Sequence, residues 1–91
     1  MRILLVDDNE EITDVVSFFC ESKDIDCQVV NDGREGLEMI QNQKFDLILL
    51  DLAMPEFSGI DVIQTLYDDG LLELNNVVIF TASSNRSLLD N

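Results

Sequence analysis

The sequence contains no histidine and only two cysteines, Cys20 and Cys27. Without histidine, the chain lacks the side chain most often used for proton transfer near neutral pH, and most zinc sites are excluded with it. Two cysteines are too few for a disulfide framework, and both lie in apolar stretches. We therefore expect two buried, free thiols and a function that uses other side chains.

Basic residues are scarce as well. Five lysines and arginines face 19 acidic residues, which gives a net charge of −14. Such a chain repels phosphate backbones and anionic lipid surfaces, and it has no basic stripe for direct nucleic-acid binding. The acidic excess favours a cation or a basic partner.

Long apolar runs are also missing. No stretch approaches the ~20 apolar residues of a membrane span, and a strand-like run follows Met1 and Arg2 directly, without a signal-peptide pattern. The sequence therefore predicts a cytoplasmic protein that does not enter a membrane. Its 91 residues, 46% of them hydrophobic, with a mean hydropathy of +0.11, indicate one folded domain.

Four short apolar runs alternate with helical patterns. The runs occupy residues 3–6, 27–30, 47–50 and 77–80. A first helical face is formed by Ile12, Val15, Val16, Phe19 and Cys20, with Asp8 or Asn9 as the cap, and a weaker pattern spans residues 36–40. A later face contains Val62, Ile63, Leu66 and Tyr67. Alternation of strands and helices with short connections predicts a parallel α/β sheet with helices on both faces.

Carboxylates follow two of the predicted strands. Asp7 and Asp8 end the first strand, and Asp51 ends the third. If these strands are neighbours, ~4.8 Å apart, their terminal side chains converge at the carboxyl edge of the sheet. Carboxylates in one crevice either take up protons or share a hard divalent cation, and oxygen ligands favour Mg²⁺. The alternative is three solvated acids in an acid-rich chain.

A hydroxyl group stands at the same predicted edge. Thr81 ends the fourth strand, and the small Ala82 follows it. A threonine after a strand is commonly a cap or a turn residue. Beside a metal and a carboxylate, it becomes a candidate donor to a phosphate oxygen.

The chain resembles the receiver domain of two-component response regulators. The matching segments are "LLVDDNEEI" (4–12), "DLILLDLAMPEFSGID" (46–61) and "VVIFTAS" (77–83). The resemblance implies a flavodoxin-like (CheY-like) fold with strand order 2-1-3-4, which lacks the family's fifth strand and last helix. Residues 1–91 would then form one receiver domain, truncated after the fourth strand.

The resemblance also implies a mechanism. Asp51 would accept a phosphoryl group from a histidine kinase, a phosphotransfer protein or a small phosphodonor. Asp8, Asp51 and the backbone carbonyl of Ala53 would bind Mg²⁺ directly, Asp7 would act through metal-bound water, and Thr81 would contact the phosphoryl group. The chain would not be an enzyme but a phosphoacceptor that assists its own phosphoryl transfer and hydrolysis. Phosphorylation of Asp51 would switch a surface that binds a partner.

The sequence departs from the family pattern in one respect that concerns chemistry. The family's lysine after the fifth strand has no counterpart, since Lys23 and Lys44 belong near the opposite edge of the predicted sheet. This leaves open a second interpretation, an acidic interaction module that is not phosphorylated. A haloacid-dehalogenase-type phosphatase would need an aspartate where Ala53 stands, and an EF-hand loop would need a glycine where Ile12 stands.

Self-association is a further expectation. With the last elements of the family fold missing, the strand at residues 77–80 becomes an apolar edge, and the first helix alone covers one sheet face. Exposed edges and apolar patches favour pairing with another chain. We expect a two-fold dimer or exchanged elements, tightened by salt because the chain is so acidic.

Overall fold

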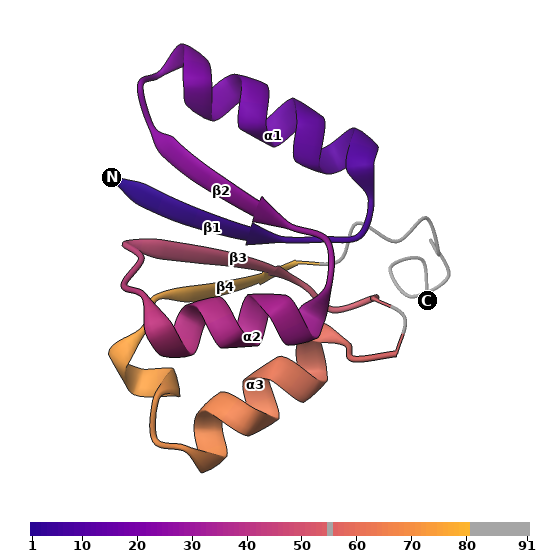
Figure 1. Ribbon diagram of the computed structural model, residues 1–91, viewed down its shortest axis with the longest axis vertical. Helices are drawn as coiled ribbons and strands as arrows, with labels where there is room; N and C mark the ends of the chain where they lie inside the picture. The colour runs from indigo at the N-terminus through magenta and orange to yellow at the C-terminus, as the bar shows by residue number, and fades with distance from the viewer. Residues whose placement is uncertain (55, 81–91) are drawn as a thin grey trace, which may run out of the picture.

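The computed structural model describes residues 1–54 and 56–80. Within this part, four parallel strands form one sheet in the order β2-β1-β3-β4. The predicted α/β fold and strand order are thus confirmed (Figure 1). Thr81 lies outside the described residues.

The strands agree with the apolar runs to within one residue at each end. They are β1 (Arg2–Val6), β2 (Asp26–Val30), β3 (Leu47–Asp51) and β4 (Val77–Phe80). The central strand β1 is apolar at successive positions and is buried from Ile3 to Val6, as expected for a strand that is covered on both faces. In the register of the sheet, Val6 lies between Val30 and Leu50, so β1, β2 and β3 end side by side.

Three helices connect the strands, and Figure 1 shows α1 apart from the packed pair α2 and α3. They are α1 (Glu10–Ser22), α2 (Gly33–Asn42) and α3 (Gly59–Asp68), followed by a 3-10 turn, η1 (Leu72–Leu74), which the sequence patterns did not predict. Of the two candidate caps for α1, Asn9 is the residue whose side chain accepts from the first turn.

The main core lies between the sheet and the pair α2 and α3. It contains Leu4, Val6, Val30, Ile40, Phe45, Ile48, Leu50, Met54, Val62 and Leu66. Gly36 permits the close approach of α2 to β1, because a Cβ atom there would lie 2.8 Å from a methyl carbon of Val6. Among the described residues, no helix is long and apolar enough to cross a membrane.

The predicted face of α1 is wrong in its orientation. Cys20 is buried and Ile12 and Val16 are half-buried, but Val15 is 69% exposed and Phe19 56% exposed. The helix packs mainly on β2 and buries Thr13 and Cys20 instead. At ~100° per residue, the buried face is rotated roughly a quarter turn from the predicted one.

Two further expectations about burial need correction. On α3, Val62 and Leu66 are buried and Ile63 is half-buried, but Tyr67 points to solvent at 68% exposure, since it lies at the end of the helix beyond the core. Both cysteines are free, as expected, although Cys27 on the edge strand β2 is only half-buried. Its partial burial beside Cys20 raises the pKa of the Cys27 thiol to about 11, which keeps it protonated and weakly nucleophilic.

Candidate functional site

Three carboxylates meet at the carboxyl edge of the sheet. Asp7 follows β1, Asp51 is the last residue of β3, and Asp8 stands beside Asp7 in the loop that leads to α1. One carboxylate oxygen from each residue can be chosen so that all three lie within 4.8 Å of one another. The convergence predicted from the strand ends is therefore confirmed. Asp7 and Asp51 are buried at 0% and 3% exposure, whereas Asp8 is exposed.

The loop after β1 holds Asp7 in place. Its Oδ1 accepts a hydrogen bond from the backbone N–H of Asn9 at 2.9 Å. Its own backbone N–H donates to the carbonyl of Val30 at 3.1 Å, and its carbonyl accepts from the side chain of Asn31 at 2.8 Å. Neither Asn9 nor Asn31 was predicted at the site from the sequence, because such residues after strands are typical of caps and turns.

Asp51 is held by a similar local turn. Its Oδ1 accepts a hydrogen bond from the backbone N–H of Ala53 at 3.0 Å. The next residue, Leu52, donates its N–H to the carbonyl of Phe80 at 2.9 Å, which ties this loop to the end of β4. Gly59 starts α3 directly against the Asp51 carbonyl, where any side chain would overlap backbone atoms.

Among the described residues, no basic side chain forms an ion pair with these carboxylates. Burial raises the pKa of Asp7 to about 6, the nearby carboxylates of Asp51 and Asp8 add to the rise, and the hydrogen bond from Asn9 opposes it. Within the described residues, Oδ2 of Asp7 is buried and has no hydrogen-bond partner. A buried acceptor without a donor, next to two further carboxylates, fits a hard divalent cation well.

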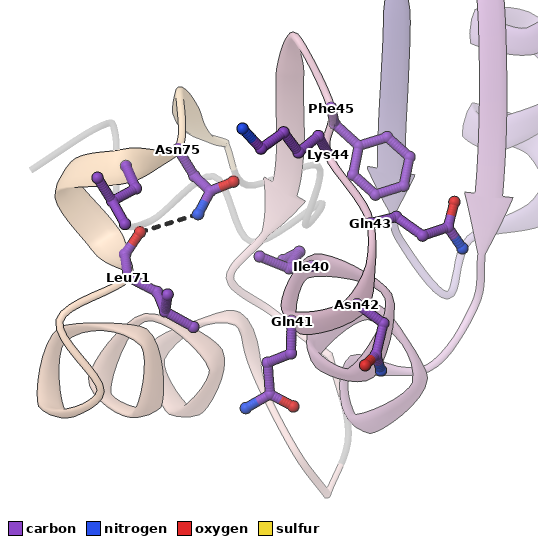
Figure 2. Close-up of a pocket in the computed structure, with 9 residues that line it drawn as sticks. Ile40, Gln41, Asn42, Gln43, Lys44, Phe45, Leu71 and Asn75 are labelled. Carbon is purple, nitrogen blue, oxygen red and sulfur yellow. Dashed lines mark hydrogen bonds between the residues drawn. The ribbon is translucent and has the colours of Figure 1, made fainter.

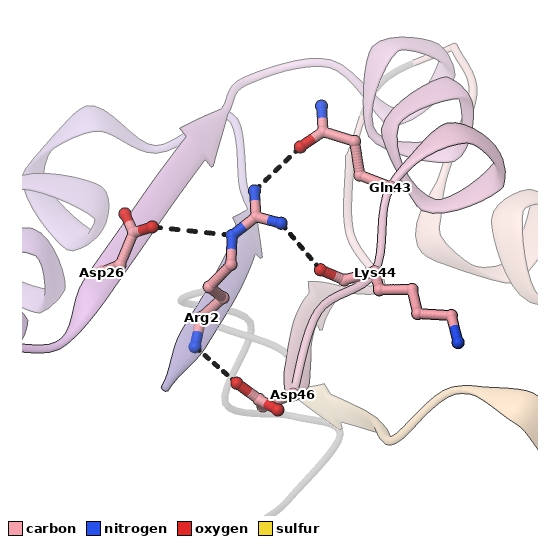
Figure 3. Close-up of polar contacts among 5 residues, drawn as sticks. All are labelled: Arg2, Asp26, Gln43, Lys44 and Asp46. Carbon is pink, nitrogen blue, oxygen red and sulfur yellow. Dashed lines mark hydrogen bonds and ion pairs between the residues drawn. The ribbon is translucent and has the colours of Figure 1, made fainter.

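Two basic residues, Arg2 and Lys44, lie at the opposite edge of the sheet. Arg2 contacts Asp26 at 3.5 Å, which is the one ion pair among the residues described, and donates to the carbonyl of Lys44 and to Oε1 of Gln43. Its backbone N–H donates to Asp46 (Figure 3). These contacts join the beginnings of the first three strands, far from the carboxylates. Lys44 is at this edge, as the sequence predicted.

An open hollow of about 360 Å³ lies at this same edge, between the end of α2 and η1 (Figure 2). Ile40, Phe45 and Leu71 supply apolar walls, and the Asn75 side chain donates to the Leu71 carbonyl at 2.8 Å. The hollow is lined by no carboxylate and is separated from the three aspartates by the length of the strands. We assign the chemistry to the carboxylate edge.

Comparison with known proteins gives a consistent result. The family model of the response regulator receiver domain matches residues 3–90. The cell cycle transcriptional regulator CtrA of Caulobacter vibrioides is 36% identical over 66 residues, which are 72% of this chain and 29% of that protein. The transcriptional regulatory protein DltR of Streptococcus agalactiae is 32% identical over 84 residues, 92% of this chain and 37% of that protein.

Solved structures agree with the fold. The receiver domain of the Francisella response regulator 1452 superimposes with a TM-score of 0.81 at 28% identity, over 96% of this chain and 70% of that one. The response regulator TrrA of Thermotoga maritima, solved with Mg²⁺ and BeF, gives a TM-score of 0.78 at 26% identity. The match covers 93% of this chain and 72% of that one. The chain spans only about a third of the length of the two curated relatives.

Proposed function

Because this chain belongs to the response regulator receiver domains of two-component systems, we propose that Asp51 is its phosphoacceptor. The observation that carries the proposal is the position of Asp51, buried at the end of β3 with carboxylate oxygens of Asp7 and Asp8 within 4.8 Å. The acidic interaction module is less favoured, because it does not require two buried aspartates to meet at one point.

Asp51 is the nucleophile in this proposal. A carboxylate oxygen of Asp51 forms the bond to phosphorus, and the bond between phosphorus and the donor's nitrogen or oxygen breaks in line with it. Ala53 holds Oδ1 through its N–H, which fixes the direction of the carboxylate. Phosphoryl transfer depends mainly on such positioning and on the stabilisation of charge.

The proposed cofactor is Mg²⁺, which would supply positive charge between the carboxylates and the phosphoryl oxygens. Asp8, Asp51 and the carbonyl of Ala53 are the residues that would hold Mg²⁺ directly, and Asp7 would assist from the second layer of ligands. The unpartnered Oδ2 of Asp7 and its raised pKa support a cation here, because both would be relieved by a positive neighbour.

The remaining assignments concern groups that assist transfer. Thr81 is proposed to donate its hydroxyl to a phosphoryl oxygen. Lys23 and Lys44 are the only lysines in the sequence, and both stand near the other edge of the sheet, so neither is assigned a role. The chain acts as a phosphoacceptor that assists its own transfer and hydrolysis.

The proposed partner is a histidine kinase or a phosphotransfer protein in the cytoplasm. The chain covers about a third of the curated transcriptional regulators that it resembles, so DNA binding by those whole proteins is not carried over to it. The expected self-association stays a prediction at this point, separate from phosphorylation.

Labelling with acetyl phosphate and Mg²⁺ tests the proposed function. The intact chain should gain one phosphoryl group that is stable in acid and lost in base, as an acyl phosphate is. Asp51→Asn should gain none, and Asp14→Asn, an exposed acid on α1, serves as the matched control. Equal labelling of Asp51→Asn and the parent would refute the assignment.

A further inference from the structure

The peptide group between Asp7 and Asp8 links two of the three carboxylates at the site. Its carbonyl accepts a hydrogen bond from the Asn31 side chain at 2.8 Å, in a partly buried position. Only the amide nitrogen of an asparagine can donate to a carbonyl oxygen, so this partner fixes the orientation of the Asn31 side chain. The contact joins the end of β1 to the turn between β2 and α2, which lie side by side in Figure 1.

The orientation of this peptide group decides where Asp8 lies. A peptide group is planar, so a fixed carbonyl also fixes the direction of the Asp8 N–H and the position of the Asp8 Cα. On the other side of Asp7, the backbone N–H donates to the Val30 carbonyl at 3.1 Å. Both peptide groups that flank Asp7 are therefore tied to residues 30 and 31, which leaves little freedom in the backbone of Asp7.

Asp8 depends on this backbone contact more than the other two aspartates do. The buried carboxylate of Asp7 accepts from the Asn9 N–H at 2.9 Å. The carboxylate of Asp51 accepts from the Ala53 N–H at 3.0 Å. Asp8 is exposed, and among the residues described no hydrogen bond holds its carboxylate in this way. Its direction is therefore set by the backbone that carries it.

Asn31 is itself held between two regular elements. It follows Val30, the last residue of β2, which pairs with Val6 in the register of the sheet. It precedes Asp32, the N-cap of α2, whose side chain accepts from the Arg34 N–H at 3.0 Å. Because its backbone is anchored on both sides, the Asn31 amide can act as a fixed support for the peptide group that it contacts.

We propose that Asn31 is a positioning residue for the metal site, which sets the direction of Asp8 through the Asp7 carbonyl and thereby favours Mg²⁺ over Ca²⁺. The inference rests on the proposed metal site and adds a residue that supports it from outside. Mg²⁺ requires near-ideal octahedral geometry with ligands at about 2.0–2.1 Å, whereas Ca²⁺ accepts flexible arrangements at about 2.3–2.6 Å. A ligand with a fixed direction therefore matters more for the smaller ion.

Calorimetric titrations with Mg²⁺ and with Ca²⁺ test the proposal on the intact chain and on Asn31→Ala. The variant lacks the donor, so we expect its Mg²⁺ affinity to fall roughly tenfold, the lower end of the range for outer partners of metal ligands. Its Ca²⁺ affinity should change by less than about threefold, because Ca²⁺ adapts to a looser site. An Asn31→Ala protein with the parent's preference between the two ions would overturn the proposal.

Asn76→Ala is the matched control. The Asn76 side chain also donates to a distant backbone carbonyl, that of Asp46, at 3.2 Å, but this contact lies at the opposite edge of the sheet. Its loss should lower the unfolding free energy without changing the ratio of the two metal affinities. Circular dichroism verifies the fold of both variants. An equal change of that ratio in Asn76→Ala and Asn31→Ala would show a general loosening of the fold and would overturn the specific role of Asn31.

An NMR titration of the parent does not depend on how the variants fold. The side-chain amide of Asn31 and the backbone N–H of Asp8 belong to the two sides of one hydrogen-bonded contact. Both signals should therefore shift with the same midpoint as Mg²⁺ is added. The side-chain amide of Asn42, which donates to the Glu38 carbonyl at 2.8 Å near the end of α2, should not shift. An Asn31 signal that does not respond would overturn the proposal.

Failure of this inference can be told apart from failure of the proposed function. A parent that is phosphorylated and binds Mg²⁺, with an Asn31→Ala variant that binds both ions as the parent does, would reject the role of Asn31 alone. A parent that binds Mg²⁺ but gains no phosphoryl group, with the expected loss of Mg²⁺ preference in Asn31→Ala, would reject Asp51 as the phosphoacceptor and support the role of Asn31.

Discussion

Asp7 should make the metal-free protein less stable as the pH rises. Its pKa is raised from the ordinary 3.8 to about 6, because the folded state buries the carboxyl group beside other acids. The folded state therefore binds this proton more tightly than the unfolded state. The loss of unfolding free energy caused by ionising Asp7 is absent below pH ~4. It grows between pH ~4 and pH ~6, and it is complete above pH ~6. The difference of about two units between the folded and unfolded pKa values corresponds to about 3 kcal/mol of lost unfolding free energy.

Asp7→Asn removes the charge and keeps an oxygen that can accept from the Asn9 N–H. In urea titrations with chelator, we expect the variant to be more stable than the parent by about 2–3 kcal/mol at pH ~7.5, with no difference at pH ~4. The difference between the two curves reports Asp7 together with its interaction with Asp51 and Asp8. Asp14→Asn, which changes an exposed acid on α1, is the matched control and should show no such trend.

Magnesium should narrow the stability difference between the parent and Asp7→Asn. A bound cation favours the ionised carboxylates, and at 100 times its dissociation constant it stabilises the folded state by ~2.7 kcal/mol. The parent should therefore gain stability with Mg²⁺ at neutral pH, and Asp7→Asn should gain less. An Asp7→Asn protein that is less stable than the parent at neutral pH without metal would refute the reasoning, and Asp7 would then be a structural acceptor.

Three further predictions concern single positions. Asp8→Asn should weaken Mg²⁺ binding several-fold by calorimetry and leave the metal-free melting temperature at least as high, because it relieves repulsion at the edge; a clear loss of metal-free stability would contradict this. Gly36→Ala should lower the unfolding free energy by ~1–3 kcal/mol in urea titrations, because the new Cβ would lie 2.8 Å from a methyl carbon of Val6. A variant that is more stable than the parent would show that α2 can shift away from β1 without cost. Leu66→Ala removes a fully buried side chain and should lower the unfolding free energy by ~2–5 kcal/mol, whereas Tyr67→Ala, at the exposed neighbour, should change it much less.

The strands and the convergence of the acids could be predicted from the sequence because they depend on local patterns. A strand covered on both faces must be apolar at successive positions, and residues 3–6 and 47–50 satisfy this. Asp7 and Asp51 follow two such runs at their carboxyl ends. Neighbouring parallel strands end at the same edge of the sheet, so Asp7 and Asp51 lie together however the rest of the chain packs. This part of the site could therefore be predicted without knowledge of the tertiary contacts.

The orientation of α1 could not be predicted in the same way. Its apolar residues, including Val15, Phe18 and Phe19, occupy more than one side of the helix, and the pattern alone does not say which side meets the sheet. The choice is made by packing on β2, which buries the polar Thr13. The backbone contacts that fix Asp7 and the three-residue turn η1 were likewise beyond the sequence, because neither leaves a periodic pattern.

The two ends of the strands differ in charge within the described part of the chain. Arg2 and Lys44 lie beside Asp26 and Asp46, so the charges at the beginnings of the strands largely cancel (Figure 3). Among the described residues, Asp7, Asp8 and Asp51 at the carboxyl ends form no ion pair with a basic side chain, and negative potential concentrates there. A cation or a positively charged protein surface is drawn toward that end and arrives already oriented. An anionic phosphodonor approaches against the same field, so its encounter rate should increase when salt screens the protein.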